Sequence, residues 1–475
     1  MLFLASLVAL AGAGTALRAQ TQNPSSAADP FWGSITLKPA TDVPVRLSLD
    51  GAVRLGFQNN LGLKEAENNQ LTLTGEKNQA LQQFLPAVTL TGDTGYYQHN
   101  LVAQGFKPSL LSKFTLFFPG GMVPPGFSTL TRDDLTEAQI HFNQTIFSGP
   151  VIAGWKAAGA AERSAYFAMM TARGQVVQDV ATTYLRCIAD ASQVENAKAQ
   201  VSEAQVLYDH QHQAHLAGTA ANLDELRARV ELQTQEQAVI AAQNQLDKEM
   251  ILLKREIGLD PGQTMVLTDP APYAELAMQT PEEAMAVAYK DRQDYQNLQN
   301  QAVEFKAFHA AYRSQRLPTL KFSGFYGTST VNGDGTRGNF AAFGTLSVPI
   351  FREARLRGDE DASLAQMQSV NDQLADLRTH IDQQVRTALL DVGANAQLVD
   401  VARSNVDLAT RALSDETDRV NAGVDDNLPL VTAQAALAAA QSNLVEGLYQ
   451  YNISKVLLAR ACGVLEQQYR NYLGR

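Results

Sequence analysis

The amino-acid sequence predicts a mainly α-helical protein with a small β part, built from two copies of one unit. Three observations support this: the second half repeats landmarks of the first at fixed offsets, long stretches lack proline, and four short stretches alternate apolar with small or polar residues. Each copy is expected to run helix, strand, strand, long helix, turn and helix. A chain of 475 residues suffices for one elongated protein of this kind.

The repeat is read from matched landmarks. At an offset of 232 residues, Leu85-Pro86 falls on Leu317-Pro318. Between residues 95 and 140 the offset drops to 204, so the first copy is 28 residues longer. Farther along, Ala217-Gly218 falls on Ala422-Gly423 at an offset of 205. Landmarks kept in this order indicate duplication of one unit.

The repeat divides the chain into six segments. We expect a signal peptide at 1–19, an N-terminal extended segment at 20–47, repeat 1 at 48–260, an inter-repeat linker at 261–279, repeat 2 at 280–465 and a C-terminal tail at 466–475. Leu2 to Ala16 is almost wholly apolar, which is too short for a comfortable membrane span and typical of a secretory signal. Cleavage after Ala19 and cleavage after Ala16 are both compatible with the sequence.

Helices are predicted where proline is absent over long stretches. The predicted helices are 48–84, 151–216, 222–257, 281–316, 352–421 and 430–461. The segment 151–216 would be about 100 Å long if continuous. Such lengths exceed a globular helix and fit coiled-coil-like hairpins, with small residues allowing close helix approach.

Strands are predicted where the residues alternate with a period of two. The predicted strands are 86–97, 138–147, 318–330 and 340–350. Alternation over roughly 10 residues is typical of a membrane β-barrel strand, and also of a half-buried sheet in a soluble domain. Between the last two strands, Asn332-Gly333-Asp334-Gly335 predicts a tight hairpin turn.

Closure of a barrel requires more strands than one chain has. About eight strands are the practical minimum, so four must be shared with other subunits. An open sheet edge in lipid would leave backbone groups unsatisfied, and a ring with cyclic symmetry avoids this. If the strands cross a membrane, the protein is therefore oligomeric.

Charge and cysteine content exclude several classes of protein. The formal net charge of -11 argues against a nucleic-acid partner. We find no Gly-rich phosphate loop, no serine elbow and no two-histidine metal motif with a general base, so we expect neither an enzyme nor a cofactor. Cys187 and Cys462 lie in apolar helical stretches and are read as small buried residues, although a bond between them stays open.

From about residue 47 to 465 the chain resembles TolC-type outer-membrane efflux proteins. Each matching motif is weak alone, but their order and duplication make the match strong. The motifs are 47–55, 59–60, 84–88 and 144–149 in the first copy, 282–285, 292–295, 317–320 and 347–351 in the second, and the turns 217–224 and 422–429.

The resemblance implies a homotrimer in the outer membrane. Each subunit would give four strands to a shared 12-stranded β-barrel and two hairpins to a periplasmic α-helical barrel. Such ducts dock on a periplasmic adaptor protein and an inner-membrane pump, and they do no chemistry. Within this class, export of small molecules and type I protein secretion both stay open. The alternative is a periplasmic or surface coiled-coil protein without a pore.

The resemblance also places the adaptor contact at the hairpin turns. The matching positions are Gly218, Thr219, Asn222, Asp224, Gly423, Val424, Asn427 and Leu428. The two glycines suit left-handed helix C-terminal caps, and the two asparagines suit N-caps of the returning helices.

The second turn departs from the family pattern. TolC itself has two aspartates after this turn, and the matching positions here are Pro429 and Thr432. Asp425 and Asp426 lie in the turn and are candidates for a substitute acidic ring, or for a solvated acidic turn.

Two further features stand out. His212 and His215 share a helical face beside the first turn, which suits either a metal site or an ordinary solvated face, whereas His210 lies off that face. The apolar, Pro- and Gly-rich stretch 106–127 coincides with the longer part of the first copy, so we expect it in the first extracellular loop.

Overall fold

The computed structural model describes residues 26–35, 39–100, 103, 130–218, 221–270, 274–277, 279–422 and 427–474. The predicted signal peptide at 1–19 and the predicted loop at 106–127 lie outside the described residues. The chain forms two compact units. One consists of Met1–Gln70, Ser164–Leu298 and Gln373–Arg475, and the other of Leu71–Arg163 and Gln299–Asp372.

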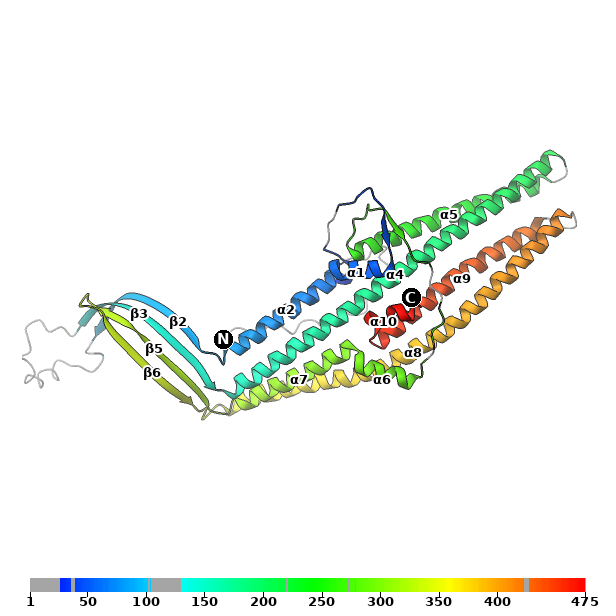
Figure 1. The fold of residues 1–475 in the computed structure, drawn as a ribbon. Coiled ribbons are helices and arrows are strands. Elements are labelled where there is room, and N and C mark those ends of the chain that lie inside the picture. The colour runs from blue at the N-terminus through cyan, green and yellow to red at the C-terminus, as the bar shows by residue number, and fades with distance from the viewer. Residues whose placement is uncertain are drawn as a thin grey trace, which may run out of the picture. The chain divides into compact units, whose positions relative to one another are not determined.

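A four-stranded antiparallel sheet forms the β part of the second unit (Figure 1). Its order is β2 (Ala87–Asn100), β3 (Leu130–Phe147), β5 (Thr319–Val331) and β6 (Arg337–Ser347). The predicted turn between β5 and β6 is confirmed, because Asn332, Gly333 and Gly335 all have positive φ. The prediction that the last strand reaches residue 350 is wrong: Pro349 has no N–H to donate and restricts the residue before it.

Long helices form two hairpins (Figure 1). They are α4 (Gly149–Leu216) with α5 (Asn222–Ile257), and α8 (Glu353–Asn421) with α9 (Asn427–Ala461). α4 has 68 residues and α8 has 69. Many buried side chains of α4 are alanines, among them Ala172, Ala181 and Ala197, and such small side chains let neighbouring helices approach closely.

The predicted single helices 48–84 and 281–316 are each broken in two, which corrects the sequence interpretation. The pairs are α1 (Leu49–Asn59) with α2 (Leu61–Gln82), and α6 (Pro281–Asp291) with α7 (Gln293–Ser314). At each break one residue is extended: Asn60 has ψ 130° and Arg292 has ψ 119°.

Side-chain contacts hold both breaks in place. The Asn60 amide donates to the carbonyl of Phe31 and accepts from the N–H of Leu63. The Arg292 guanidinium donates to the carbonyl of Ala461 and to Asp294. Neither break contains proline, so periodicity alone could not reveal it.

The predicted extended segment and linker contain paired structure. β1 (Val45–Leu47) from the N-terminal segment pairs in parallel with β4 (Met265–Leu267) from the linker. A short 3-10 helix, η1 (Pro30–Trp32), precedes β1.

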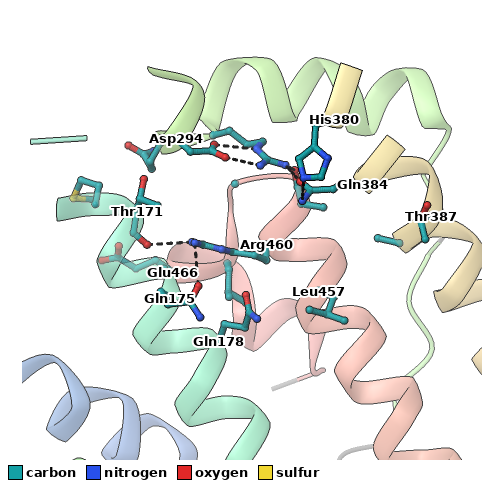
Figure 2. A pocket seen from close by; sticks show the side chains of 18 of the residues that line it. Thr171, Gln175, Gln178, Asp294, His380, Gln384, Thr387, Leu457, Arg460 and Glu466 are labelled. Carbon is teal, nitrogen blue, oxygen red and sulfur yellow. Dashed lines mark hydrogen bonds and ion pairs between the residues drawn. The ribbon is translucent and has the colours of Figure 1, made fainter. Parts of the chain in front are cut away.

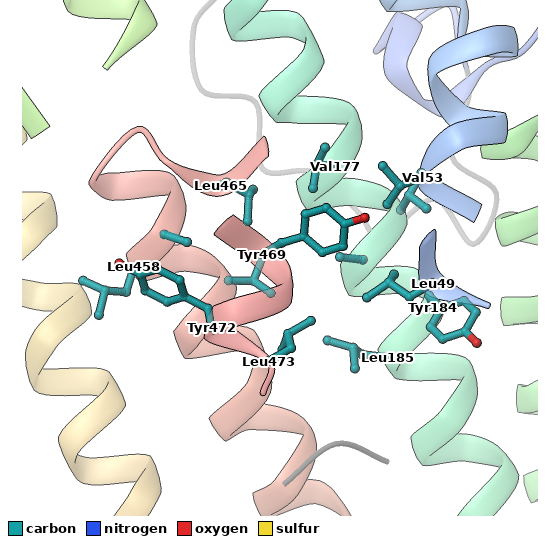
Figure 3. Packing of buried hydrophobic residues seen from close by; sticks show 14 of the residues in the cluster. Leu49, Val53, Val177, Tyr184, Leu185, Leu458, Leu465, Tyr469, Tyr472 and Leu473 are labelled. Atoms are coloured by element: carbon teal, nitrogen blue, oxygen red, sulfur yellow. The ribbon is translucent and has the colours of Figure 1, made fainter. Parts of the chain in front are cut away.

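The predicted C-terminal tail is also part of the core, which corrects the sequence interpretation. It forms α10 (Leu465–Tyr472), whose Leu465, Tyr469 and Tyr472 pack among residues of α1, α4 and α9 (Figure 3). Leu473 has no exposed surface. The Tyr469 hydroxyl donates to Asp50 of α1, so this helix joins the end of the chain to its beginning.

Both cysteines are free and buried. Burial raises the pKa of the Cys187 thiol, and it raises that of Cys462 to about 11. The Cys187–Cys462 bond that the sequence left open is therefore not formed.

Two left-handed glycines with different surroundings give a matched test of the packing at the second break. Gly218 and Gly463 both have φ +75°, but a Cβ would meet open space at Gly218 and the Arg292 backbone at 2.6 Å at Gly463. We expect Gly218→Ala to cost about 1 kcal/mol of stability, from conformation alone. Gly463→Ala should cost at least about 2 kcal/mol, because Arg292 must also move.

Thermal unfolding of the two detergent-solubilised variants measures this difference. Equal shifts in melting temperature would show that the close approach of Gly463 to Arg292 contributes nothing.

Candidate functional site

One face of the four-stranded sheet carries an exposed apolar row. Leu90 pairs with Ile140, Ile140 with Tyr326 and Tyr326 with Phe340, so the four side chains lie on one face across all four strands. Their exposed fractions are 75%, 49%, 69% and 78% in the same order. In water such a surface would be costly, since it leaves large apolar side chains uncovered.

The opposite face is largely polar. The imidazole of His141 lies 3.1 Å from the Thr91 hydroxyl on this face. Two rows cross all four strands here, Thr91–Gln139–Gly327–Asn339 and Asp93–Glu137–Ser329–Arg337. The sheet therefore separates an apolar environment on one side from a polar one on the other.

Both outer edges of this sheet lack a partner strand in the described part of the chain. β2 and β6 are the terminal strands, so their outward backbone N–H and C=O groups are free to pair with another strand. Among helices of the described residues, none combines the length and apolar character that crossing a bilayer requires.

The first hairpin turn shows one expected cap and corrects another. Gly218 takes the left-handed conformation, and its N–H donates to the carbonyl of His215. Asn222 is not the N-cap: Ala221 takes that position without a side-chain hydrogen bond. The Asp224 carboxylate lies in the first turn of α5, where an acid is favoured by the helix dipole, and 3.5 Å from Arg227.

Most of the second turn lies outside the described residues. This applies to Gly423, Val424, Asp425 and Asp426, and to Thr219 of the first turn. Asn427 begins α9 and Leu428 follows it, although their side chains are not described. Pro429 occupies the first turn of α9, where a missing N–H is tolerated.

An apolar groove of about 410 Å³ lies beside the first turn, and the sequence interpretation missed it. Leu223, Leu226 and Val230 of α5 line it together with Leu207 of α4 and Val431 of α9. Leu223, Leu226 and Val230 are each at least half exposed. The spacing of these three residues by three and four positions was the available signal.

The structure brings His212 and His215 together around one carboxylate. His212 Nδ1 lies 2.8 Å from one oxygen of Glu225, and His215 Nε2 lies 3.8 Å from the other. His212 also stacks on Tyr208. In the described residues no group of three His, Cys, Asp or Glu side chains is arranged to hold a metal ion. The histidines therefore join α4 to α5 near the turn.

A polar cavity of about 580 Å³ lies at the break between α6 and α7 (Figure 2). Arg460 extends into its wall and donates to the carbonyl of Thr171 and to the amide oxygen of Gln175. Gly174 makes room for it, since a Cβ there would lie 2.2 Å from the guanidinium. Burial lowers the pKa of Arg460, and the nearby Arg292 lowers it further.

Comparison with known proteins identifies the family. Residues 54–259 and 288–464 match the outer membrane efflux protein family. The chain belongs to this family. The membership assigns it to the outer membrane and confirms the resemblance read from the motifs.

Two curated relatives come from Pseudomonas putida. They are the probable efflux pump outer membrane protein SepC and the toluene efflux pump outer membrane protein TtgF. Each is 24% identical over 295 residues, which is 61% of this chain. The matched part spans 60% of the length of each relative.

Solved structures share the fold. The Campylobacter jejuni CmeC outer membrane channel has a TM-score of 0.74 at 14% identity, covering 92% of both chains. The Vibrio cholerae outer membrane protein VceC has a TM-score of 0.73 at 16% identity, covering 87% of this chain and 96% of that one. The mainly helical fold with a small sheet is thus that of outer-membrane channels.

The histidine pair can be tested as a metal site. We expect Zn²⁺ to leave the melting temperature of the detergent-solubilised protein unchanged, because in the described residues these side chains are not arranged to hold a metal ion together. A rise of several degrees that the double variant His212→Ala/His215→Ala abolishes would contradict this interpretation.

Proposed function

We propose that the chain is one subunit of a homotrimeric outer-membrane exit duct. Three copies share a 12-stranded β-barrel, and their helical hairpins continue as a periplasmic α-helical barrel. The observation that carries this proposal is the sheet with one exposed apolar face, one polar face and two unpaired edges.

The two outer edges of the sheet are the reason why the copies must share one barrel. In lipid, each backbone group left without a hydrogen-bond partner costs several kcal/mol, so a four-stranded sheet cannot stay open there. Pairing β6 of one copy with β2 of the next removes the edges from both copies. Three copies give 12 strands, and the apolar row through Leu90 and Phe340 then faces lipid, while the polar rows face the lumen.

The partners follow from family membership and from the relatives' names. Both curated relatives are named as outer membrane proteins of efflux pumps. We infer that this duct likewise serves an inner-membrane pump through a periplasmic adaptor, which docks at the hairpin turns around Gly218 and Asn427. It exports passively and catalyses no reaction. Small molecules and secreted proteins both remain candidate cargo, because the duct receives what its pump delivers.

The alternative, a coiled-coil protein without a pore, is not favoured. The helical hairpins are compatible with it, but it gives no role to the exposed row formed by Leu90, Ile140, Tyr326 and Phe340.

Planar-bilayer recording on the purified protein tests the duct directly. We expect discrete, long-lived openings from a species whose mass is three times that of the mature chain. The mass is measured on the same detergent extract. A homogeneous preparation that stays monomeric and never conducts would overturn the proposal.

The acidic second turn can be tested in the same recordings. Asp425→Ala/Asp426→Ala removes two acids from each copy, so a trivalent cation should block the current severalfold less effectively. Asp372→Ala/Asp376→Ala, on the exposed surface of α8, is the matched control with the same charge change. If only the control alters the block, or neither does, the turn forms no acidic ring.

A further inference from the structure

A buried carboxylate on the seam between α4 and α5 lacks a complete set of partners. Glu256 of α5 is 2% exposed. Its Oε1 accepts a hydrogen bond from the Thr183 hydroxyl of α4 at 3.1 Å, but its Oε2 has no partner in the described part of the chain. An isolated buried carboxylate is costly to ionise, so this arrangement favours a bound proton.

A second acid, Asp179, lies on α4 one helical turn before Thr183. The Asp179 carboxylate accepts both of its hydrogen bonds from the Gln175 amide, at 2.8 and 3.0 Å. The Gln175 amide oxygen in turn accepts from Arg460 of α9. A polar chain thus runs from Arg460 through Gln175 to Asp179, which lies one helical turn from Thr183, the hydrogen-bond partner of Glu256.

The charges around this pair favour protonation. Asp179 faces Asp29 of the N-terminal segment and Arg460 of α9, and Glu256 faces Asp179 and Glu249 of α5. Two further acids, Asp29 and Glu249, and one arginine, Arg460, therefore act on the pair. Burial is the main cause of the raised pKa values, about 6 for Asp179 and about 8 for Glu256, and the neighbouring acids raise them further.

We propose that Asp179 and Glu256 form a proton-binding pair that fastens the base of α5 to α4, and that loss of their protons loosens this seam. The C-terminal end of α5 also contacts the first helix break, because the Asn59 amide donates a hydrogen bond to the carbonyl of Ile257. Loosening therefore reaches α1 and the segment around Asp29. This inference does not depend on the proposed transport function.

The direction of the pH dependence follows from the raised pKa values. The folded protein holds these protons above the pH at which an unfolded chain has released them. The stabilisation is complete below the ordinary carboxyl range, near pH 4, and is lost as the pH rises past about 6 and then about 8. The packing of the end of α5 against α4 is therefore more stable in mild acid than in mild alkali.

Hydrogen exchange of the full chain in detergent tests the proposal. The readout is the protection of residues 250–257 at the end of α5, divided by that of residues 437–444 in the middle of α9. The α9 segment has no ionisable side chain, so it controls for the effect of pH on exchange. Between pH 6 and pH 9 we expect this ratio to fall at least about tenfold, the change that one pKa unit produces.

Two variants and a matched control decide the outcome. Glu256→Gln should remove most of the fall in the ratio, and Asp179→Asn should reduce the fall, because each removes one member of the repelling pair. Glu236→Gln makes the same change at an exposed position of α5 and should behave like the unchanged protein. The proposal is overturned if the ratio stays constant in the unchanged protein, or if both Glu256→Gln and Asp179→Asn retain its full fall.

Discussion

Backbone groups along the outer edges of β2 and β6 are the constraint on which the proposed assembly depends. In the described part of the chain no strand pairs with these edges. The exposed apolar row through Leu90 and Phe340 makes water an unfavourable environment for this face of the sheet. Lipid is a favourable environment for the apolar row, but each unpaired backbone group at a sheet edge is energetically costly there. The proposed closed ring of sheets meets both demands, and its closure would set the symmetry for the rest of the chain.

The long helices differ from the sheet in that they are stabilised by close packing of small side chains. Ala172, Ala181 and Val176 of α4 are almost fully buried, and α10 adds Leu465 and Tyr469 to the same core. Larger side chains at these positions would push neighbouring helices apart. Buried residues of α1, α6 and α10 belong to this core as well.

Much of this fold could be predicted from sequence because its signals are local. Alternation revealed the four strands, and Asn332-Gly333-Asp334-Gly335 revealed the turn between β5 and β6. The helix breaks were missed because Asn60 and Arg292 act through distant partners, Phe31 and Ala461. The α10 helix was missed because it is short and its burial depends on tertiary packing. The Asp179–Glu256 pair was equally invisible, since 77 residues separate two acids that look ordinary in sequence.

Matched positions in the two halves use different chemistry on similar backbones. Each break rests on the end of a returning helix: Asn59 donates to Ile257 in the first half, and Arg292 donates to Ala461 in the second. In the first half the N-terminal segment covers the break, whereas in the second a polar cavity lines it. Near the ends of α5 and α9 the two halves carry different residues, the acid Glu256 and the base Arg460, and Arg460 is linked to Asp179 through Gln175. Duplication explains the shared backbone, and the side chains that hold each break have diverged within it.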